Sequence, residues 1–139
     1  MKTLNKYDLQ KLEEYWSNHQ QNKRLLQFKE WELTSKTSDD ENTGGGRSSG
    51  ISNPTEQAAA KLLNDKTYQN LKTIINAVEV LYRHADEDIQ TIVDMRYWDK
   101  ERNCYEWEEI ADRLNLSRSK VLRLRNVLLD DTADMIGWV

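Results

Sequence analysis

The apolar residues between positions 107 and 124 recur at spacings that fit two short helices joined by a tight turn. Ile110, Ala111 and Leu114 share one face of the first helix, and Val121 and Leu124 share one face of the second. Ala111 is small where a second helix has to approach closely, and Val121 is β-branched and apolar where it meets that alanine. The spacing predicts a helix-turn-helix in which these side chains point inward.

The residues at the turn agree with that arrangement. Asn115 stands where the backbone has to become left-handed, and Asn is the usual second choice after Gly for that conformation. Ser117 follows as a cap for the second helix, because its hydroxyl accepts a hydrogen bond from a backbone amide of the first turn. The early outward face of this second helix carries Arg118, Ser119, Lys120 and Arg123.

The distribution of charge points to an anionic partner at this helix. The formal net charge is -4, yet residues 118–129 hold four bases and no acid, which leaves 16 bases against 24 acids elsewhere. In a DNA-binding helix-turn-helix, the second helix lies in the major groove with its N-terminal residues against the base edges. The alternative is an ordinary amphipathic hairpin with a solvated basic face. We expect DNA contacts from Ser117, Arg118, Ser119, Lys120 and Arg123, with Arg125 nearer the phosphates.

The composition favours helices throughout the chain. Pro occurs once and Gly five times in 139 residues, whereas Lys, Glu, Leu, Gln and Asp recur. We expect an all-α protein with one domain or two small ones. No apolar run approaches the roughly 20 residues of a membrane helix, and the first ten residues lack the apolar core of a signal peptide. We therefore expect a cytoplasmic protein with no membrane partner.

Residues 1–33 form a predicted N-terminal helical segment. Leu9, Leu12 and Trp16 share one helix face, and a polar run at residues 18–22 offers a point where the segment divides into two helices. Such an apolar face either packs into a core or binds a partner.

Residues 34–53 are the predicted flexible linker. They contain four of the five glycines, many Ser, Thr, Asp and Asn residues and no aromatic residue. A segment of this composition buries too little apolar area to offset its ordering entropy. The alternative for Gly44 to Arg47 is a loop that approaches a phosphate, although their spacing matches no phosphate-binding loop.

Residues 54–85 form a predicted long scaffold helix. Asn53 and Pro54 are a helix-start signal, and a kink is expected near residues 64–65. The alternative is the seam of a coiled-coil dimer, which would need three or more regular heptads of apolar residues. The apolar stripe of this helix comprises Leu63, Leu71, Ile74, Ile75, Val78 and Tyr82.

Residues 86–139 form the predicted DNA-binding domain. They begin with a helix whose first turn is acidic and which carries Ile89, Ile92, Val93 and Tyr97 along one side. The helix is expected to end near residues 98–99, and the helix-turn-helix follows.

Residues with potential metal or catalytic chemistry are few and scattered. His19, His84 and Cys104 have no spacing typical of metal ligands, so we interpret them as structural or surface residues and expect no metal and no cofactor. No nucleophile and base pair, phosphate loop or distinct carboxylate cluster is recognisable, and we expect no enzyme.

Residues 86–131 resemble sigma-70 region 4, which recognises the promoter -35 element. In that family an acidic helix ending in Arg-Tyr-aromatic precedes a Glu-Ile-Ala-x-x-Leu helix and a Ser-led recognition helix. The matching positions are Arg96-Tyr97-Trp98, Glu109-Ile110-Ala111, Leu114 and Ser117 to Val121. The front of the chain has no counterpart of the regions of a full sigma factor that melt a promoter.

The whole chain resembles the RinA/ArpU family of phage late-gene transcriptional activators. The shared features are length, an N-terminal helical segment, a Gly-Gly-Gly segment leading to Pro54-Thr55-Glu56, and a terminal sigma-like helix-turn-helix. The resemblance implies a phage protein that binds promoter DNA and activates packaging and structural genes with host RNA polymerase at the bacterial nucleoid. A homodimer is one assembly compatible with this role. A small terminase-like packaging adaptor is the alternative, and a ring of eight or more subunits would favour it.

Overall fold

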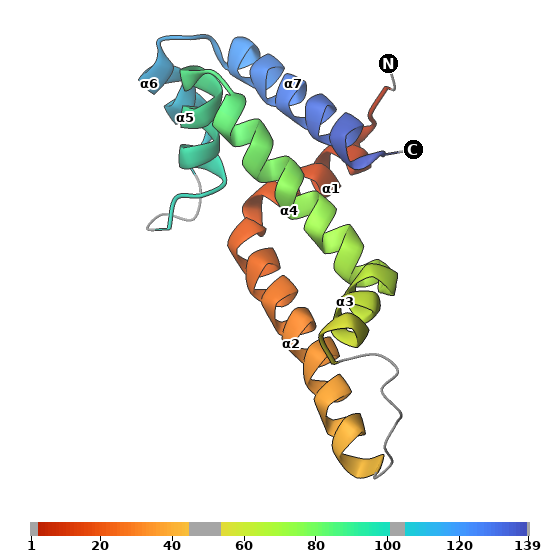
Figure 1. Cartoon of the computed structure of the whole chain (residues 1–139). Helices are drawn as coiled ribbons and strands as arrows, with labels where there is room; N and C mark the ends of the chain where they lie inside the picture. Colours follow the sequence, from red (N-terminus) through yellow and green to blue (C-terminus); the bar gives the residue numbers. More distant parts are fainter. Residues whose placement is uncertain (1–2, 45–53, 101–104, 139) are drawn as a thin grey trace. The chain divides into compact units, whose positions relative to one another are not determined.

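The computed structural model describes residues 3–44, 54–100 and 105–138, with side chains described for 3–35, 56–100 and 105–138. Within these ranges every regular element is a helix, which confirms the expected all-α class (Figure 1). The helices are α1 (Lys6–Ser17), α2 (His19–Gly44), α3 (Pro54–Asn64), α4 (Lys66–His84), α5 (Glu87–Arg96), α6 (Trp107–Leu114) and α7 (Arg118–Ile136).

Polar side chains fix several helix starts. Asn5 and Asp8 form a reciprocal capping box at the start of α1, with hydrogen bonds of 2.9 and 3.0 Å. Asp86 caps α5 by accepting a hydrogen bond from the amide of Ile89 at 3.1 Å. The predicted division of the N-terminal segment is confirmed, because α1 ends at Ser17 and α2 begins at His19.

The chain divides into two compact units that do not follow the predicted segments. Unit 1 comprises Met1–Gln20 and Ile74–Val139, and unit 2 comprises Gln21–Thr73. The first helix therefore belongs with the C-terminal helices rather than with the segment that follows it. Long-range side-chain contacts of Glu13 and Trp16 with α7 place α1 in unit 1.

The core of unit 1 draws its fully buried side chains from α1, α4, α5, α6 and α7. The predicted apolar faces of these helices are largely confirmed, because Ile92, Val93 and Val78 are fully buried and Tyr97 is 8% exposed. The fully buried apolar residues of this core are Leu12, Trp16, Val78, Ile92, Val93, Ile110, Val121 and Leu129.

A buried hydrogen-bond chain links α1 to α7. The indole Nε1 of Trp16 donates to the hydroxyl of Thr132 at 3.0 Å, and that hydroxyl donates to the carbonyl of Leu128 at 2.8 Å. Both Trp16 and Thr132 are fully buried, so neither polar group has water as an alternative partner. The pair fixes the position of α1 against the second half of α7.

The predicted scaffold helix is two helices rather than one. The helix breaks at Asp65, whose carboxylate accepts a hydrogen bond from the Tyr68 amide at 2.8 Å and so starts α4 afresh. This break lies at the expected kink. Leu63 was predicted on the apolar stripe, but it is 72% exposed, because the break removes it from the register of α4.

Unit 2 holds its helices together through polar contacts. Lys29 of α2 forms an ion pair of 3.7 Å with Asp65, and the Tyr68 hydroxyl of α4 donates to the Glu30 carboxylate of α2 at 3.4 Å. These contacts define the side of α2 that faces α4.

The predicted linker begins too early. Its first eleven positions continue α2, which extends to Gly44. Low apolar content does not end a helix that has already formed, because each added residue gains a backbone hydrogen bond. The Thr34 hydroxyl lies within this continuous helix and donates to the Glu30 carbonyl one turn earlier, at 2.8 Å. The rest of the linker, residues 45–53, and Cys104 lie outside the described residues.

Replacing Thr132 with Val tests the buried link between α1 and α7. Val has nearly the same shape but leaves the Trp16 indole N–H unpaired, so we expect a loss of about 1–3 kcal/mol in the free energy of unfolding. Urea denaturation followed by far-UV circular dichroism measures this loss. Thr132→Ser keeps the hydroxyl and should retain more stability than Thr132→Val; the reverse order would contradict the role given to the hydrogen bond.

Candidate nucleic-acid interface

The interface is built around the turn between α6 and α7. Asn115 ends α6 with φ 58° and ψ 42°, which is the left-handed conformation predicted for it. The Leu116 amide then donates back to the Ala111 carbonyl at 3.0 Å and closes the turn. Ser117 starts α7, and its hydroxyl accepts from the Lys120 amide at 3.1 Å, which confirms the predicted cap.

The predicted inward residues of both helices are buried. Ile110 and Val121 have no exposed surface and Ala111 is 4% exposed. Leu114 and Leu124 are partly buried against the same core. The sequence register of the two helices is therefore correct at these five positions.

The first turns of α7 present polar and basic side chains to solvent. Arg118 forms an ion pair with Glu108 of α6, with its Nε 2.9 Å from the carboxylate. Both side chains remain more than half exposed. An exposed ion pair of this kind contributes at most about 1 kcal/mol and exchanges readily for another anion. Within the described part of the chain, no carboxylate forms an ion pair with Lys120 or Arg123. The exposed set is Ser117, Arg118, Ser119, Lys120 and Arg123.

Arg125 is not placed where the sequence analysis expected it. Its side chain is only 15% exposed, and its Nη1 lies 3.0 Å from the Glu13 carboxylate of α1. Its Nε also donates to Asn126 at 2.9 Å. A guanidinium held in this way is not available to a phosphate, so we remove Arg125 from the expected DNA contacts.

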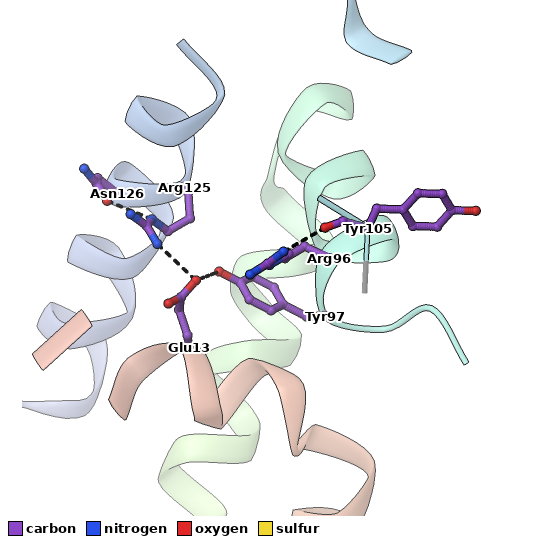
Figure 2. A network of polar contacts seen from close by, with 6 residues as sticks. All are labelled: Glu13, Arg96, Tyr97, Tyr105, Arg125 and Asn126. Atoms are coloured by element: carbon purple, nitrogen blue, oxygen red, sulfur yellow. Dashed lines mark hydrogen bonds and ion pairs between the residues drawn. The ribbon is translucent and has the colours of Figure 1, made fainter. Parts of the chain in front are cut away.

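Figure 2 shows the network that holds Arg125. The Glu13 carboxylate accepts from Arg125 and also from the Tyr97 hydroxyl, at 2.5 Å, so one carboxylate joins α1 to residues after α5 and in α7. Arg96 donates to the Tyr105 carbonyl at 2.8 Å. The guanidinium groups of Arg96 and Arg125 also lie over the Trp107 ring, at 4.6 and 5.4 Å from its centre.

The Tyr97 phenol is a permanent donor in this network. Burial, followed by the neighbouring Glu13 carboxylate, raises the pKa of Tyr97 above its ordinary value of 10.0. The hydroxyl therefore stays protonated at neutral pH and donates to Glu13, while Arg125 supplies the compensating positive charge. The network is an internal clamp on α7 rather than a surface for a ligand.

Glu13 and Trp107 were not predicted as neighbours of α7, and Arg125 was predicted near the phosphates rather than in this network. A signal for Arg125 was present, because it lies four residues after Val121 and three before Leu128, which are both buried. These spacings place Arg125 on the inward face of α7. No local pattern indicated Glu13, because its partners lie 84 and 112 residues away in the sequence.

The described fold and site define an all-α chain with an exposed basic face at the start of its last long helix. Residues 6–134 match the family described as "Protein of unknown function (DUF722)", and the chain belongs to that family. Comparisons with curated proteins and with solved structures gave no match. Among the described residues, no helix is long and apolar enough to cross a membrane.

The left-handed residue gives a direct test of the turn. We expect Asn115→Ala to lower the free energy of unfolding by about 1 kcal/mol, because a Cβ without a local hydrogen-bonding group disfavours this conformation. Asn115→Gly should be at least as stable as the parent protein. Thermal and urea unfolding of the two variants provide the comparison, and equal stability of both would contradict a left-handed backbone at this position.

Arg125→Met tests the internal clamp. The substitution keeps much of the side-chain volume but leaves the Glu13 carboxylate without its cation, so we expect a loss of about 1.5–3 kcal/mol in the free energy of unfolding. The matched control is Arg123→Met on the exposed face, which should change stability by no more than about 0.5 kcal/mol. Urea titrations of both variants make the comparison, and similar losses would contradict the placement of Arg125.

Proposed function

We propose that this protein is a sequence-specific DNA-binding transcriptional activator that places the start of α7 in the major groove of promoter DNA. The observation that carries the proposal is the exposed basic face that follows the Ser117 cap. Behind that face, Val121 is buried against the core, so the backbone of this helix is held firmly while its outer side chains remain available. A rigid helix with free donors on its outer side suits the hydrogen-bond acceptors of base edges.

Two residues are best suited to reading bases. Lys120 and Arg123 are exposed, and Arg123 has the planar pair of donors that matches the two acceptors of guanine. Arg118 is suited to a phosphate, because it lies at the first position of α7 and exchanges its exposed contact with Glu108 for a stronger anion. Ser117 and Ser119 add hydroxyl groups that can contact either a base or a phosphate.

The acidic chain as a whole is compatible with DNA binding. The net charge of -4 weakens long-range attraction to any DNA, which lowers non-specific binding. Local charge at the start of α7 remains positive, since residues 118–129 contain no acid. This distribution of charge favours sequence-specific DNA binding over non-specific DNA binding.

The activating role rests on the resemblance to sigma-70 region 4 and to the RinA/ArpU activators. From these resemblances we infer a phage protein that acts at the late promoters of packaging and structural genes. It acts in the cytoplasm of a bacterial host, together with host RNA polymerase. In this proposal the protein carries out no chemistry, and its output is the occupancy of a promoter.

Selection of bound duplexes from a random pool identifies the DNA sequence that the protein prefers. We expect a defined motif, whose position upstream of late genes can then be tested by genome-wide occupancy in the induced host. Failure to enrich any motif, at salt concentrations where some DNA is still bound, would contradict sequence-specific binding.

Arg123→Ala separates base reading from general attraction. We expect affinity for the selected duplex to fall by about 1–3 kcal/mol more than affinity for a scrambled duplex, because a bidentate contact to guanine is lost. The matched control is Arg83→Ala, which removes an exposed positive charge at the end of α4. Binding titrations across salt concentration measure both variants. Equal losses on the two duplexes, or equal effects of the two substitutions, would show that Arg123 does not read bases.

A further inference from the structure

An exposed apolar strip runs along α2 within unit 2. Leu25, Phe28 and Trp31 are 46%, 57% and 62% exposed, and the rings of Phe28 and Trp31 lie 5.8 Å apart. Single exposed apolar residues are common, but three large ones at successive spacings of three form a contiguous patch on one helix face.

Another side of α2 already has its neighbours. Lys29 and Glu30 contact Asp65 and Tyr68, so that side faces the start of α4. A helix advances by about 100° per residue, which puts Leu25 and Trp31 about 60° to either side of Phe28. Lys29 and Glu30 lie about 100° and 160° from Phe28, so the centre of the strip points away from the contacts inside unit 2 and stays exposed.

The charges beside the strip are complementary to those of a second copy. Arg24 and Glu32 stand four residues before and four residues after Phe28, and both lie within about 40° of it around the helix. A two-fold axis through Phe28 exchanges these two positions. We propose that the α2 helices of two chains pair antiparallel about Phe28, so that Phe28 meets Phe28 of a second copy, Leu25 meets Trp31, and Arg24 meets Glu32.

The antiparallel direction follows from the charges and side-chain sizes. A parallel pair would set Arg24 against Arg24 and Glu32 against Glu32, which is repulsive at both ends. The antiparallel pair makes two attractive contacts and matches the smaller Leu25 with the larger Trp31. The intrahelical contact of Glu32 with Lys29, at 3.6 Å, is compatible with this pairing because a carboxylate accepts several hydrogen bonds.

An interface centred on aromatic side chains and bordered by charges matches the general anatomy of protein contacts. Buried aromatic residues supply most of the affinity, and the surrounding charges determine direction and partner. None of these α2 residues belongs to the proposed DNA-binding helix, so self-association and DNA binding can fail separately.

Sedimentation equilibrium of the full chain over a wide concentration range is the first test. We expect a reversible dimer of twice the 16.4 kDa chain mass. Phe28→Asp should raise the dimer dissociation constant by about thirtyfold or more, as expected for a central aromatic residue. Gln27→Asp introduces the same charge at the neighbouring exposed position of α2, outside the strip, and should leave the dimer largely intact. Circular dichroism confirms that each variant keeps its helix content.

Two charge reversals test the direction of pairing. Arg24→Glu makes both flanks acidic and Glu32→Arg makes both flanks basic, so each variant alone should dimerise about tenfold more weakly. An equimolar mixture should recover near-parental association, because every flank then meets its opposite. Both positions are solvent-accessible, so these substitutions do not disturb a core.

A parent chain that stays monomeric at all concentrations would overturn the proposal and show that another part of the chain, or another protein, covers the strip. Equal association of Phe28→Asp and Gln27→Asp would overturn it as well. If the mixture of charge reversals associates no better than the separate variants, the antiparallel arrangement about Phe28 is wrong. A discrete ring of eight or more subunits would replace the two-fold dimer with the assembly expected of a packaging adaptor.

Discussion

The carboxylate of Glu13 is the constraint on which the position of α7 depends. It accepts from Tyr97 and from Arg125, and it is the only anion among the described residues within ion-pair distance of that guanidinium. Buried charges are costly unless they are paired, so Arg125 is stable in this position only while α1 supplies Glu13. The first helix is therefore part of the structure that holds the proposed DNA-binding helix, although more than one hundred residues separate them. Residues 86–139 alone lack this support, and they are an incomplete domain.

This inward use of Arg125 changes how the basic charge of α7 is interpreted. A count of bases over residues 118–129 gives four, but one of them is neutralised inside unit 1. Three remain on the surface, and Arg118 shares its charge with Glu108. Fewer free cations mean fewer phosphate contacts and a shallower dependence on salt. In the proposed DNA complex, recognition by this helix would then depend more on hydrogen bonds to bases from Lys120 and Arg123 than on general attraction.

Local signals predicted the local structure well. Residue spacing within a stretch of twenty residues predicted the left-handed Asn115, the Ser117 cap and the buried Ala111. This was possible because turns and caps are determined by the residues that form them. The helical class followed from composition. The inward position of Arg125 was also predictable from the buried residues around it. It was predicted near the phosphates instead, because basic residues in such a helix commonly contact DNA. The roles of Glu13 and Thr132 were not readable, because their partners are distant in the sequence and no periodicity relates them.

The exposed strip explains why the apolar residues of α2 are not confined to one side of that helix. Apolar residues occur on both of its sides, with Leu26 and Leu33 half-buried and Phe28 and Trp31 exposed. A pattern of this kind is typical of a helix with two different neighbours. If the second neighbour is another α2, each assembly carries two copies of α7. In the proposed DNA complex, two copies of α7 in one assembly would contact two half-sites, so affinity for a DNA carrying two copies of the recognised sequence would exceed affinity for a single half-site.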